Sequence, residues 1–257
     1  MRTSMLVSLA SLAAISLIGA APADAASARI AAALADPERF AADRAEDAVR
    51  HAEPVLRFLD LRPGMRVMDA LAGGGYYTEL LSRVVGPRGK VFAYNNPPYF
   101  KFGEKTIAQR YVGNRLPNVT QLTATIDELT LEPASLDAVI FVMAYHDLYW
   151  RPADGSWPPT DPLALLRKIH AALKNDGVVL VQDHTANPNG DPSAVVNALH
   201  RIDPLRVRAD FEAAGFRFER ESKVLAHPAD DHSKLVFDPA IRGKTDQFLY
   251  RFRKANR

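Results

Sequence analysis

The feature that most constrains the fold is a glycine-rich turn between an apolar run and a helical pattern, in the stretch VMDALAGGGYYTELL at residues 67–81. Glycines in such a turn let the backbone approach a ligand and let amide groups at the start of the helix point at its polar atoms. Asp69 lies four residues before the first glycine. A carboxylate there favours a ligand with a cationic end and would repel a pyrophosphate. Gly73, Gly74 and Gly75 therefore predict a ligand-binding turn, with a purely structural tight turn as the alternative.

Apolar runs of strand length alternate with helical patterns along most of the chain. This alternation predicts a doubly wound, mostly parallel α/β sheet, which binds its ligands at the carboxyl ends of the strands. The expected strands are residues 66–70, 90–95, 118–124, 136–144 and 177–184, and the expected helices are residues 44–59, 78–85 and 162–173.

The last part of the chain departs from this pattern. Residues 216–225 and 245–254 are two strand candidates with no helical pattern between them. A crossover between parallel strands needs a long connection, usually a helix, so we expect this pair to form an antiparallel hairpin.

The first residues have the features of an export signal. Residues 5–21 carry no charge, follow Arg2, and end in two small-x-small patterns around Ala23 and Ala25. We therefore expect residues 1–25 to be a cleaved secretory signal peptide, residues 26–60 a helical cap and residues 61–257 the α/β domain. The mature protein would be periplasmic or secreted, without stable membrane insertion. The alternative is an uncleaved signal that anchors the chain in the inner membrane.

Charge and cysteine content exclude several kinds of function. The chain has 32 basic and 30 acidic residues, interspersed, for a net charge of +2. No basic stripe marks a nucleic-acid surface, so we expect no nucleic-acid partner. The sequence has no cysteine, which excludes disulfides, thiolate metal sites and a cysteine nucleophile. The oligomeric state is not predicted.

The segment VMDALAGGGYYTELLSRVVGPRGKVFAYN resembles the first glycine motif and second strand of the class I S-adenosylmethionine-dependent methyltransferases. AAGF followed by a hairpin is similar to the reversed sixth and seventh strands of that fold, so the resemblance covers most of residues 61–254. In detail the chain is similar to small exported bacterial proteins that are predicted methyltransferases. The resemblance implies a Rossmann-like, seven-stranded, mostly parallel sheet. It also implies S-adenosylmethionine as cofactor and methyl transfer to an unidentified small molecule.

The resemblance also implies a set of cofactor-binding residues. Asn95 stands where the family usually has an acid that holds the ribose hydroxyls, and an amide can still accept one hydrogen bond and donate another. Thr125 and Ile126, followed by Asp127, stand where an acid often contacts the adenine amine. The full set implied for the cofactor is Asp69, Ala72, Gly73, Gly75, Asn95, Thr125, Ile126, Asp127 and Ala144.

The stretch AYHDLYW, residues 144–150, follows the fourth expected strand, where an acceptor would meet the methyl group. Methyl transfer needs alignment, and a base if the accepting atom carries a proton. His146 is the candidate base, Asp147 would orient it or bind substrate, and Tyr145 would shape the pocket. The alternative is that His146 only hydrogen-bonds between the strand end and a helix.

The stretch NNPPYF contains an Asn-Pro-Pro-Tyr sequence that matches a motif of methyltransferases acting on amide nitrogens. In those enzymes the motif follows the fourth strand, whereas Asn96 to Tyr99 follow the second. We therefore interpret it as a proline-stiffened loop.

Other polar groups could bind a metal. Asp183 and His184 close the fifth strand and, with Asp147, resemble the divalent-metal site of some small-molecule O-methyltransferases, which would suit magnesium or calcium. A third oxygen ligand is not obvious, Asn187 being the nearest, and residues 227–232 are interpreted as an exposed loop. No metal ligand is therefore assigned, and His51, His170 and His200 are interpreted as surface or packing residues.

Six aromatic residues fall in expected loops near the carboxyl end of the sheet. Grouped there, they would either wall a pocket for an apolar small molecule or pack the N-terminal helices onto the sheet. They are Tyr99, Phe100, Phe102, Tyr149, Trp150 and Trp157.

Two classes of function remain open from the sequence. The first is the methyltransferase. The second is a non-catalytic exported protein that binds a small ligand on the same fold, because S-adenosylmethionine is made in the cytoplasm. A nicotinamide dehydrogenase is disfavoured by Asp69, by Thr78 in place of a third glycine, and by the terminal hairpin.

Overall fold

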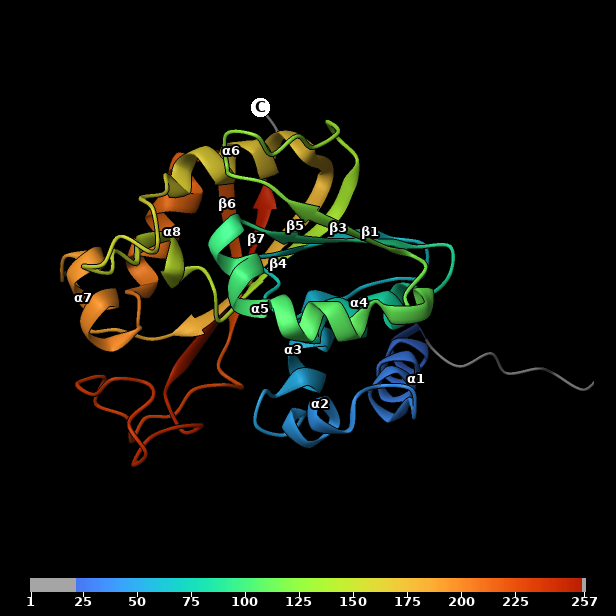
Figure 1. Ribbon diagram of the computed structural model, residues 1–257, viewed down its shortest axis with the longest axis horizontal. Helices are drawn as coiled ribbons and strands as arrows, with labels where there is room; N and C mark the ends of the chain where they lie inside the picture. Colours follow the sequence, from blue (N-terminus) through green and yellow to red (C-terminus); the bar gives the residue numbers. More distant parts are fainter. Residues whose placement is uncertain (1–21, 256–257) are drawn as a thin grey trace, which may run out of the picture.

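The computed structural model describes residues 22–255 (Figure 1). The predicted signal peptide lies outside the described residues except for its last four, which begin the first helix. Within residues 22–255, no helix is long and apolar enough to cross a bilayer.

A seven-stranded sheet forms the centre of the molecule, in the order β3-β2-β1-β4-β5-β7-β6. The first five strands are parallel, and β7 is antiparallel to both β5 and β6. The doubly wound sheet and the terminal hairpin are therefore confirmed. The strands are β1 (Arg66–Ala70), β2 (Lys90–Asn95), β3 (Val119–Thr123), β4 (Leu136–Val142), β5 (Leu173–His184), β6 (Phe216–Ser222) and β7 (Gln247–Lys254).

Helices cover both faces of this sheet, with α1, α3 and α4 on one face and α6 and α8 on the other (Figure 1). Four of them begin in the same way: Asn96, Asp161, Asp191 or Asp203 caps the first turn with its side chain, and proline follows in that turn. Both features favour helix starts. The helices are α1 (Pro22–Ala35), α2 (Ala41–Glu46), α3 (Ala52–Leu59), α4 (Tyr76–Val85), α5 (Pro97–Arg110), η1 (Val112–Asn114), η2 (His146–Tyr149), α6 (Pro162–Ala172), α7 (Pro192–Leu199) and α8 (Pro204–Ala213).

Three local predictions were wrong. The helix expected at residues 44–59 is two helices, α2 and α3, separated by a turn in which His51 has a left-handed backbone conformation. The expected proline-stiffened loop after β2 is the first turn of α5, because Asn96 caps it. Tyr99, Phe100 and Phe102 therefore lie on a helix and not in a loop.

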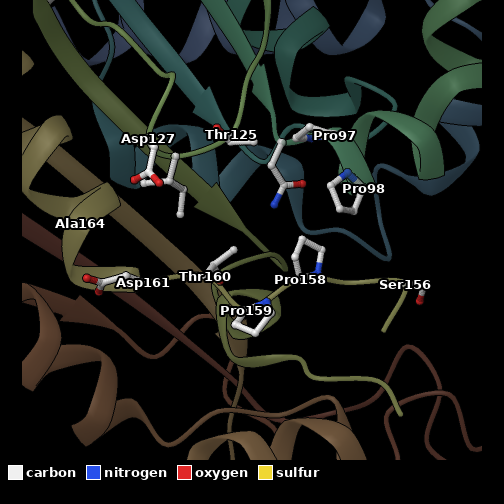
Figure 2. A pocket seen from close by; sticks show the side chains of 12 residues that line it. Pro97, Pro98, Thr125, Asp127, Ser156, Pro158, Pro159, Thr160, Asp161 and Ala164 are labelled. Carbon is white, nitrogen blue, oxygen red and sulfur yellow. The ribbon is translucent and has the colours of Figure 1, made fainter. Parts of the chain in front are cut away.

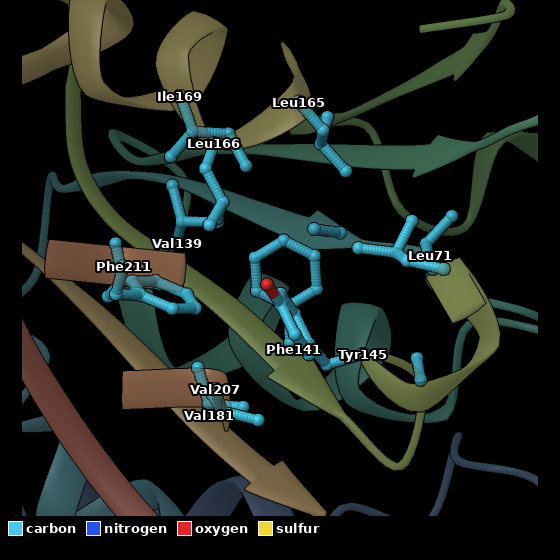
Figure 3. Close-up of a cluster of buried hydrophobic side chains, with 14 of the residues drawn as sticks. Leu71, Val139, Phe141, Tyr145, Leu165, Leu166, Ile169, Val181, Val207 and Phe211 are labelled. Atoms are coloured by element: carbon cyan, nitrogen blue, oxygen red, sulfur yellow. The ribbon is translucent and has the colours of Figure 1, made fainter. Parts of the chain in front are cut away.

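Side chains of the inner strands alternate between two apolar layers, as the pleat requires. Phe141 of β4 points into the layer shared with α6 and α8, where it packs near Tyr145 and Phe211 (Figure 3). Its neighbour Ile140 points into the opposite layer, with Leu80 of α4 and the N-terminal helices. Burial of both faces explains why the inner strands are almost uniformly apolar.

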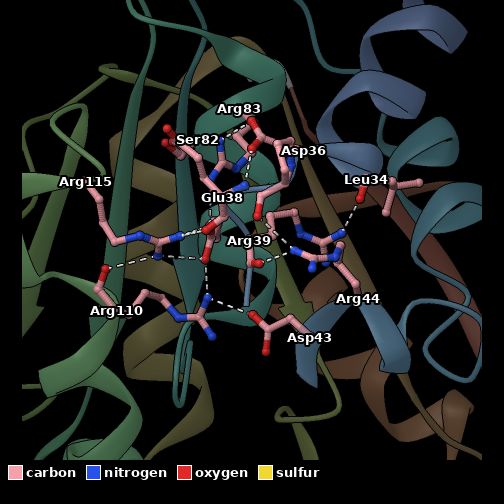
Figure 4. Close-up of polar contacts among 12 residues, drawn as sticks. Leu34, Asp36, Glu38, Arg39, Asp43, Arg44, Ser82, Arg83, Arg110 and Arg115 are labelled. Atoms are coloured by element: carbon pink, nitrogen blue, oxygen red, sulfur yellow. Dashed lines mark hydrogen bonds and ion pairs between the residues drawn. The ribbon is translucent and has the colours of Figure 1, made fainter. Parts of the chain in front are cut away.

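A buried charge cluster fastens the N-terminal helices and α5 to α4 (Figure 4). The carboxylate of Glu79 is fully buried and pairs with Arg83, Arg110 and Arg115. Arg110, 1% exposed, also pairs with Asp43 of α2 at 2.8 Å. The guanidinium groups hold the pKa of Glu79 below its usual range, against burial, which acts in the opposite direction.

Candidate functional site

Two cavities open at the carboxyl edge of the sheet, on either side of β1. The first, of about 650 Å³, follows β2 and β3 and is called here the β2–β3 cavity. Figure 2 shows Pro97 and Pro98 facing Pro158 and Pro159 across it. The second, of about 640 Å³, follows β4 and β5 and is called the β4–β5 cavity. β1 and its glycine turn lie between the two because β1 separates β2 from β4 in the sheet.

The glycine turn has the backbone conformation that its sequence predicts. Gly73 and Gly75 have φ of 54° and 83°, which non-glycine residues rarely adopt. Asn95, at the end of β2, holds the turn from the side: Gly73 N donates to its Oδ1 at 2.9 Å, and its Nδ2 donates to Gly73 O at 3.1 Å. Both polar atoms of Asn95 therefore support the turn, and Asn96 lines the β2–β3 cavity in its place.

Helix α5 packs directly against this turn. A Cβ on Gly103 would lie 2.8 Å from the backbone carbonyl carbon of Gly73, so only glycine allows this approach. Thr106 and Arg110 fill the space beside Gly74 and Gly75, and Arg110 Nε donates to Gly74 O at 2.6 Å. The glycines thus serve close helix packing as well as any ligand.

Asp69 is 3% exposed at the end of β1 and accepts a hydrogen bond from Thr78 Oγ1 at 2.6 Å. Burial raises the pKa of Asp69 to about 6, although the Thr78 hydrogen bonds act to lower it. A buried carboxylate with this pKa is ionised at neutral pH at an energetic cost. A cationic group of a ligand would offset that cost.

Tyr99 connects the glycine turn to the residues that follow β4. Its ring lies beside Gly73, and its hydroxyl donates to Asp147 Oδ2 at 2.6 Å. Trp157 packs edge-on against the Tyr99 ring and donates from Nε1 to the Asp147 backbone oxygen. Tyr99 and Trp157 therefore pack against each other and against Asp147, and neither is among the residues that line the β2–β3 and β4–β5 cavities.

The structure brings His146 and Asp147 together at the end of β4. His146 Nε2 lies 3.3 Å from Asp147 Oδ1, and His146 Nδ1 lies 2.7 Å from Asp183 Oδ1. Burial lowers the pKa of His146, but Asp147 and Asp183 outweigh burial and raise it to about 9. With this pKa the imidazole is protonated on both nitrogens, and positively charged, at neutral pH. It must lose one of these protons before it can act as a base.

Tyr145 lies away from both cavities. Its side chain is fully buried, packs beside Phe141 and Phe211, and donates to Asp210 Oδ2 at 2.9 Å. The expectation that Tyr145 shapes the pocket is therefore not met, because the backbone after β4 turns this side chain into the core.

Eight of the nine cofactor residues implied by the resemblance separate into two groups, and Ala144 belongs to neither. Thr125, Ile126 and Asp127 line the β2–β3 cavity, whereas Asp69, Ala72, Gly73, Gly75 and Asn95 form and support the turn. Ala144 is 1% exposed and belongs to the core beside η2.

The oxygen-rich metal rim suggested by the sequence is not assembled. Both carboxylate oxygens of Asp183 accept hydrogen bonds, from His146 and from the backbone of His184. Asn187 points toward the β6–β7 connection, where its Nδ2 donates to Asp231 O at 3.4 Å.

The β4–β5 cavity has walls from distant parts of the chain. Arg50 comes from the turn before α3, and Phe237, Arg242 and Lys244 come from the long connection between β6 and β7. Residues 227–229 and 231 are exposed in the loop between β6 and β7, as expected, and a buried ion pair between Arg201 and Asp230 holds that connection to the domain. Sequence reasoning missed these wall residues because nothing local identifies which loops meet.

Comparisons with known proteins identify a similar domain and a shared fold. Residues 68–181 match the family model described as a methyltransferase domain. An Aquifex aeolicus S-adenosylmethionine-dependent methyltransferase shares the fold with a TM-score of 0.58 at 21% identity, covering 89% of this chain and 98% of that one. A Mesorhizobium loti methyltransferase gives a TM-score of 0.54 at 16% identity over 80% of this chain and 99% of that one. The chain therefore has the fold of S-adenosylmethionine-dependent methyltransferases, and residues 68–181 are similar to a methyltransferase domain.

Curated relatives act on different acceptors. Over 128 residues the chain is 33% identical to the tRNA (adenine(58)-N(1))-methyltransferase TrmI of Thermus thermophilus, covering 49% of this chain and 43% of that protein. Over 183 residues it is 26% identical to the ubiquinone/menaquinone biosynthesis C-methyltransferase UbiE of Pasteurella multocida, covering 68% and 61%. The chain thus spans less than two thirds of these relatives, and they do not fix its acceptor.

Proposed function

We propose that the protein transfers the methyl group of S-adenosylmethionine to a small-molecule acceptor. The observation that carries the proposal is the buried Asp69 at the head of the glycine turn, at the same edge of the sheet as a cavity formed by the ends of β2 and β3. A carboxylate and an open cavity in these two places match the cationic amine and the nucleoside of this cofactor. S-adenosylmethionine would supply an electrophilic methyl group when bound.

The residues present fit the nucleoside part of the cofactor better than the methionine part. The β2–β3 cavity is large enough for a nucleoside and presents Asn96, Thr125 and Asp127 as polar groups. Over the turn, by contrast, the Tyr99 ring and the Thr106 side chain occupy the space beside Gly73 and Gly74.

The acceptor is proposed to bind in the β4–β5 cavity. His146 and Asp147, at the end of β4, lie on the side of β1 where this cavity opens. Arg50, Arg242 and Lys244 outnumber Glu46 in its lining, which suits an acceptor with a negative group. His146 as base, with Asp147 beside it, remains a prediction of the sequence.

Calorimetric titration of the purified protein with S-adenosylmethionine and with S-adenosylhomocysteine tests the proposal. We expect saturable binding of both, with S-adenosylmethionine bound at least tenfold more weakly by Asp69→Asn. Asp176→Asn, an exposed acid in the first part of β5, is the matched control and should bind like the wild type. Absence of heat with both ligands at millimolar concentration would overturn the proposal.

We also propose export, on the evidence of the uncharged stretch at residues 5–21. Residues 1–26 fused to a compartment reporter should direct it out of the cytoplasm. The same fusion with Leu12→Arg should not be exported, because a charge interrupts the apolar segment. A wild-type fusion that stays in the cytoplasm contradicts the proposal.

A further inference from the structure

We propose that His146, Asp147 and His200 form a binding site for one divalent transition-metal ion, separate from the cofactor site. One ring nitrogen of each histidine and one carboxylate oxygen of Asp147 all lie within 4.8 Å of one another. His146 and Asp147 begin η2, in the segment that follows β4, and His200 is the C-cap of α7, so the cluster joins two distant parts of the chain.

A second carboxylate orients the first histidine. Asp183, fully buried at the end of β5, accepts from His146 N at 3.0 Å and contacts His146 Nδ1 at 2.7 Å. With a proton on Nδ1 facing this carboxylate, Nε2 is directed at Asp147 Oδ1, 3.3 Å away. Histidine ligands in metal sites are typically held in this way, with the other ring nitrogen donating to a carboxylate.

The second histidine has an unused polar atom. His200 Nδ1 is buried, and no group in the described part of the chain hydrogen-bonds to it. Its ring contacts the rings of His146, Trp150 and Phe237, at centroid distances of 5.4, 5.5 and 5.1 Å. An unsatisfied buried nitrogen costs about 1–3 kcal/mol, and its presence beside a second histidine and a carboxylate points to a ligand.

The donor set selects the class of ion. Two imidazole nitrogens and one carboxylate oxygen suit zinc, iron, cobalt, nickel or manganese, whereas magnesium and calcium prefer oxygen ligands alone. Ligand atoms around such an ion lie about 3–3.5 Å apart, given bonds of about 2.0–2.2 Å. Asp147 and His200 are only half-buried, so small side-chain rotations can close the present separation.

Three protein ligands leave at least one coordination position free. Phe237, which contacts the His200 ring, also lines the β4–β5 cavity. The free position would therefore be close to the proposed acceptor site, although the metal site does not depend on methyl transfer. With an ion bound to its Nε2, His146 would be a ligand and would not act as the base.

The test is a titration of the full chain, stripped with a chelator and then dialysed, with zinc chloride or cobalt chloride by calorimetry and visible absorption. We expect one ion per chain and no comparable binding of magnesium. His200→Ala should weaken zinc binding at least a hundredfold, and Asp183→Asn about 10–100-fold. His227→Ala, in an exposed position, should bind zinc like the wild type.

Melting curves without metal show whether each variant is folded, and His200→Ala is the decisive variant because its side chain is only half-buried. Absence of saturable zinc or cobalt binding overturns the proposal, as does wild-type affinity in folded His200→Ala. Because S-adenosylmethionine binding depends on Asp69 and is measured separately, failure of the metal site and failure of the proposed function are distinguishable.

Discussion

The glycine turn and the histidine cluster lie at the same edge of the sheet, but they are built in different ways. The turn is formed by consecutive residues between β1 and α4, and its shape follows from glycines with positive φ. The cluster is formed by η2, the end of β5 and the end of α7, which meet only in the folded chain. The glycine turn can therefore be identified from one continuous stretch of sequence, whereas the histidine cluster cannot.

The two regions also differ in how their charges are handled. Among residues 22–255, no cationic group lies within hydrogen-bonding distance of Asp69, so its carboxylate depends on Thr78 and on any ligand. His146 lies between two carboxylates and is fully buried. An unpaired buried acid suits a site that binds a cation reversibly, whereas a histidine between two acids suits a fixed structural or metal-binding arrangement.

The largest change in stability is expected at the buried charge cluster around Glu79, which holds α5 and the N-terminal helices against α4 beside the glycine turn. Glu79→Gln leaves Arg83, Arg110 and Arg115 without their shared carboxylate, and we expect a loss of about 3–5 kcal/mol in the free energy of unfolding. Denaturant unfolding measures it. Glu212→Gln, which removes an exposed pair with Arg208, should cost less than about 0.5 kcal/mol. Similar losses in both variants would show that the Glu79 cluster has no special role.

The next largest effect is expected for Asp69→Asn, which should weaken ligand binding but stabilise the ligand-free protein. Because burial raises the pKa of Asp69 to about 6, the folded protein binds a proton here more tightly than the unfolded chain. The protonated Asp69 therefore stabilises the folded state at low pH. This stabilisation is lost as the pH rises from 3.8, the ordinary pKa of the group, through about 6. Asp69→Asn should then stabilise the ligand-free protein by about 2–3 kcal/mol at pH 8, with no gain near pH 4.

The measurement is unfolding of both proteins across this pH range, with Asp176→Asn as the control. The wild type should also bind S-adenosylmethionine more weakly as pH falls below about 6, since the carboxylate is then neutral. A stabilisation that is independent of pH would contradict the role given to ionisation of Asp69.

The smallest effect is expected at the contact between the two regions. Tyr99→Phe removes the hydroxyl that donates to Asp147 and keeps the ring beside Gly73. We expect a loss of about 1 kcal/mol in the free energy of unfolding, typical of one hydrogen bond. Asp147→Asn in the Tyr99→Phe background should then cost less than Asp147→Asn alone. Strict additivity in this double-mutant cycle would show that the two regions are not coupled through Tyr99.

The sequence predicted the strands of the sheet, the antiparallel pairing of the last two strands and the position of the glycine turn. These features depend on local periodicity and on glycine conformation. It placed Asp69, Thr125 and Asp127 correctly at strand ends, since parallel strands bring their carboxyl ends to one edge. It missed α5, although Asn96 followed by two prolines is a helix-start pattern, because the same residues also favour a loop.

The tertiary structure alone decided how these residues are used. The Asn95 side chain hydrogen-bonds to Gly73 and does not line the cavity, and the Tyr145 side chain is buried in the core. The ring of His200, which was interpreted as a surface or packing residue, contacts the ring of His146. Side-chain direction and contacts between distant segments depend on packing of the whole chain, which local patterns do not contain. The sequence by itself therefore determined the class of fold and the position of the turn, and the tertiary structure decided which side chains meet there.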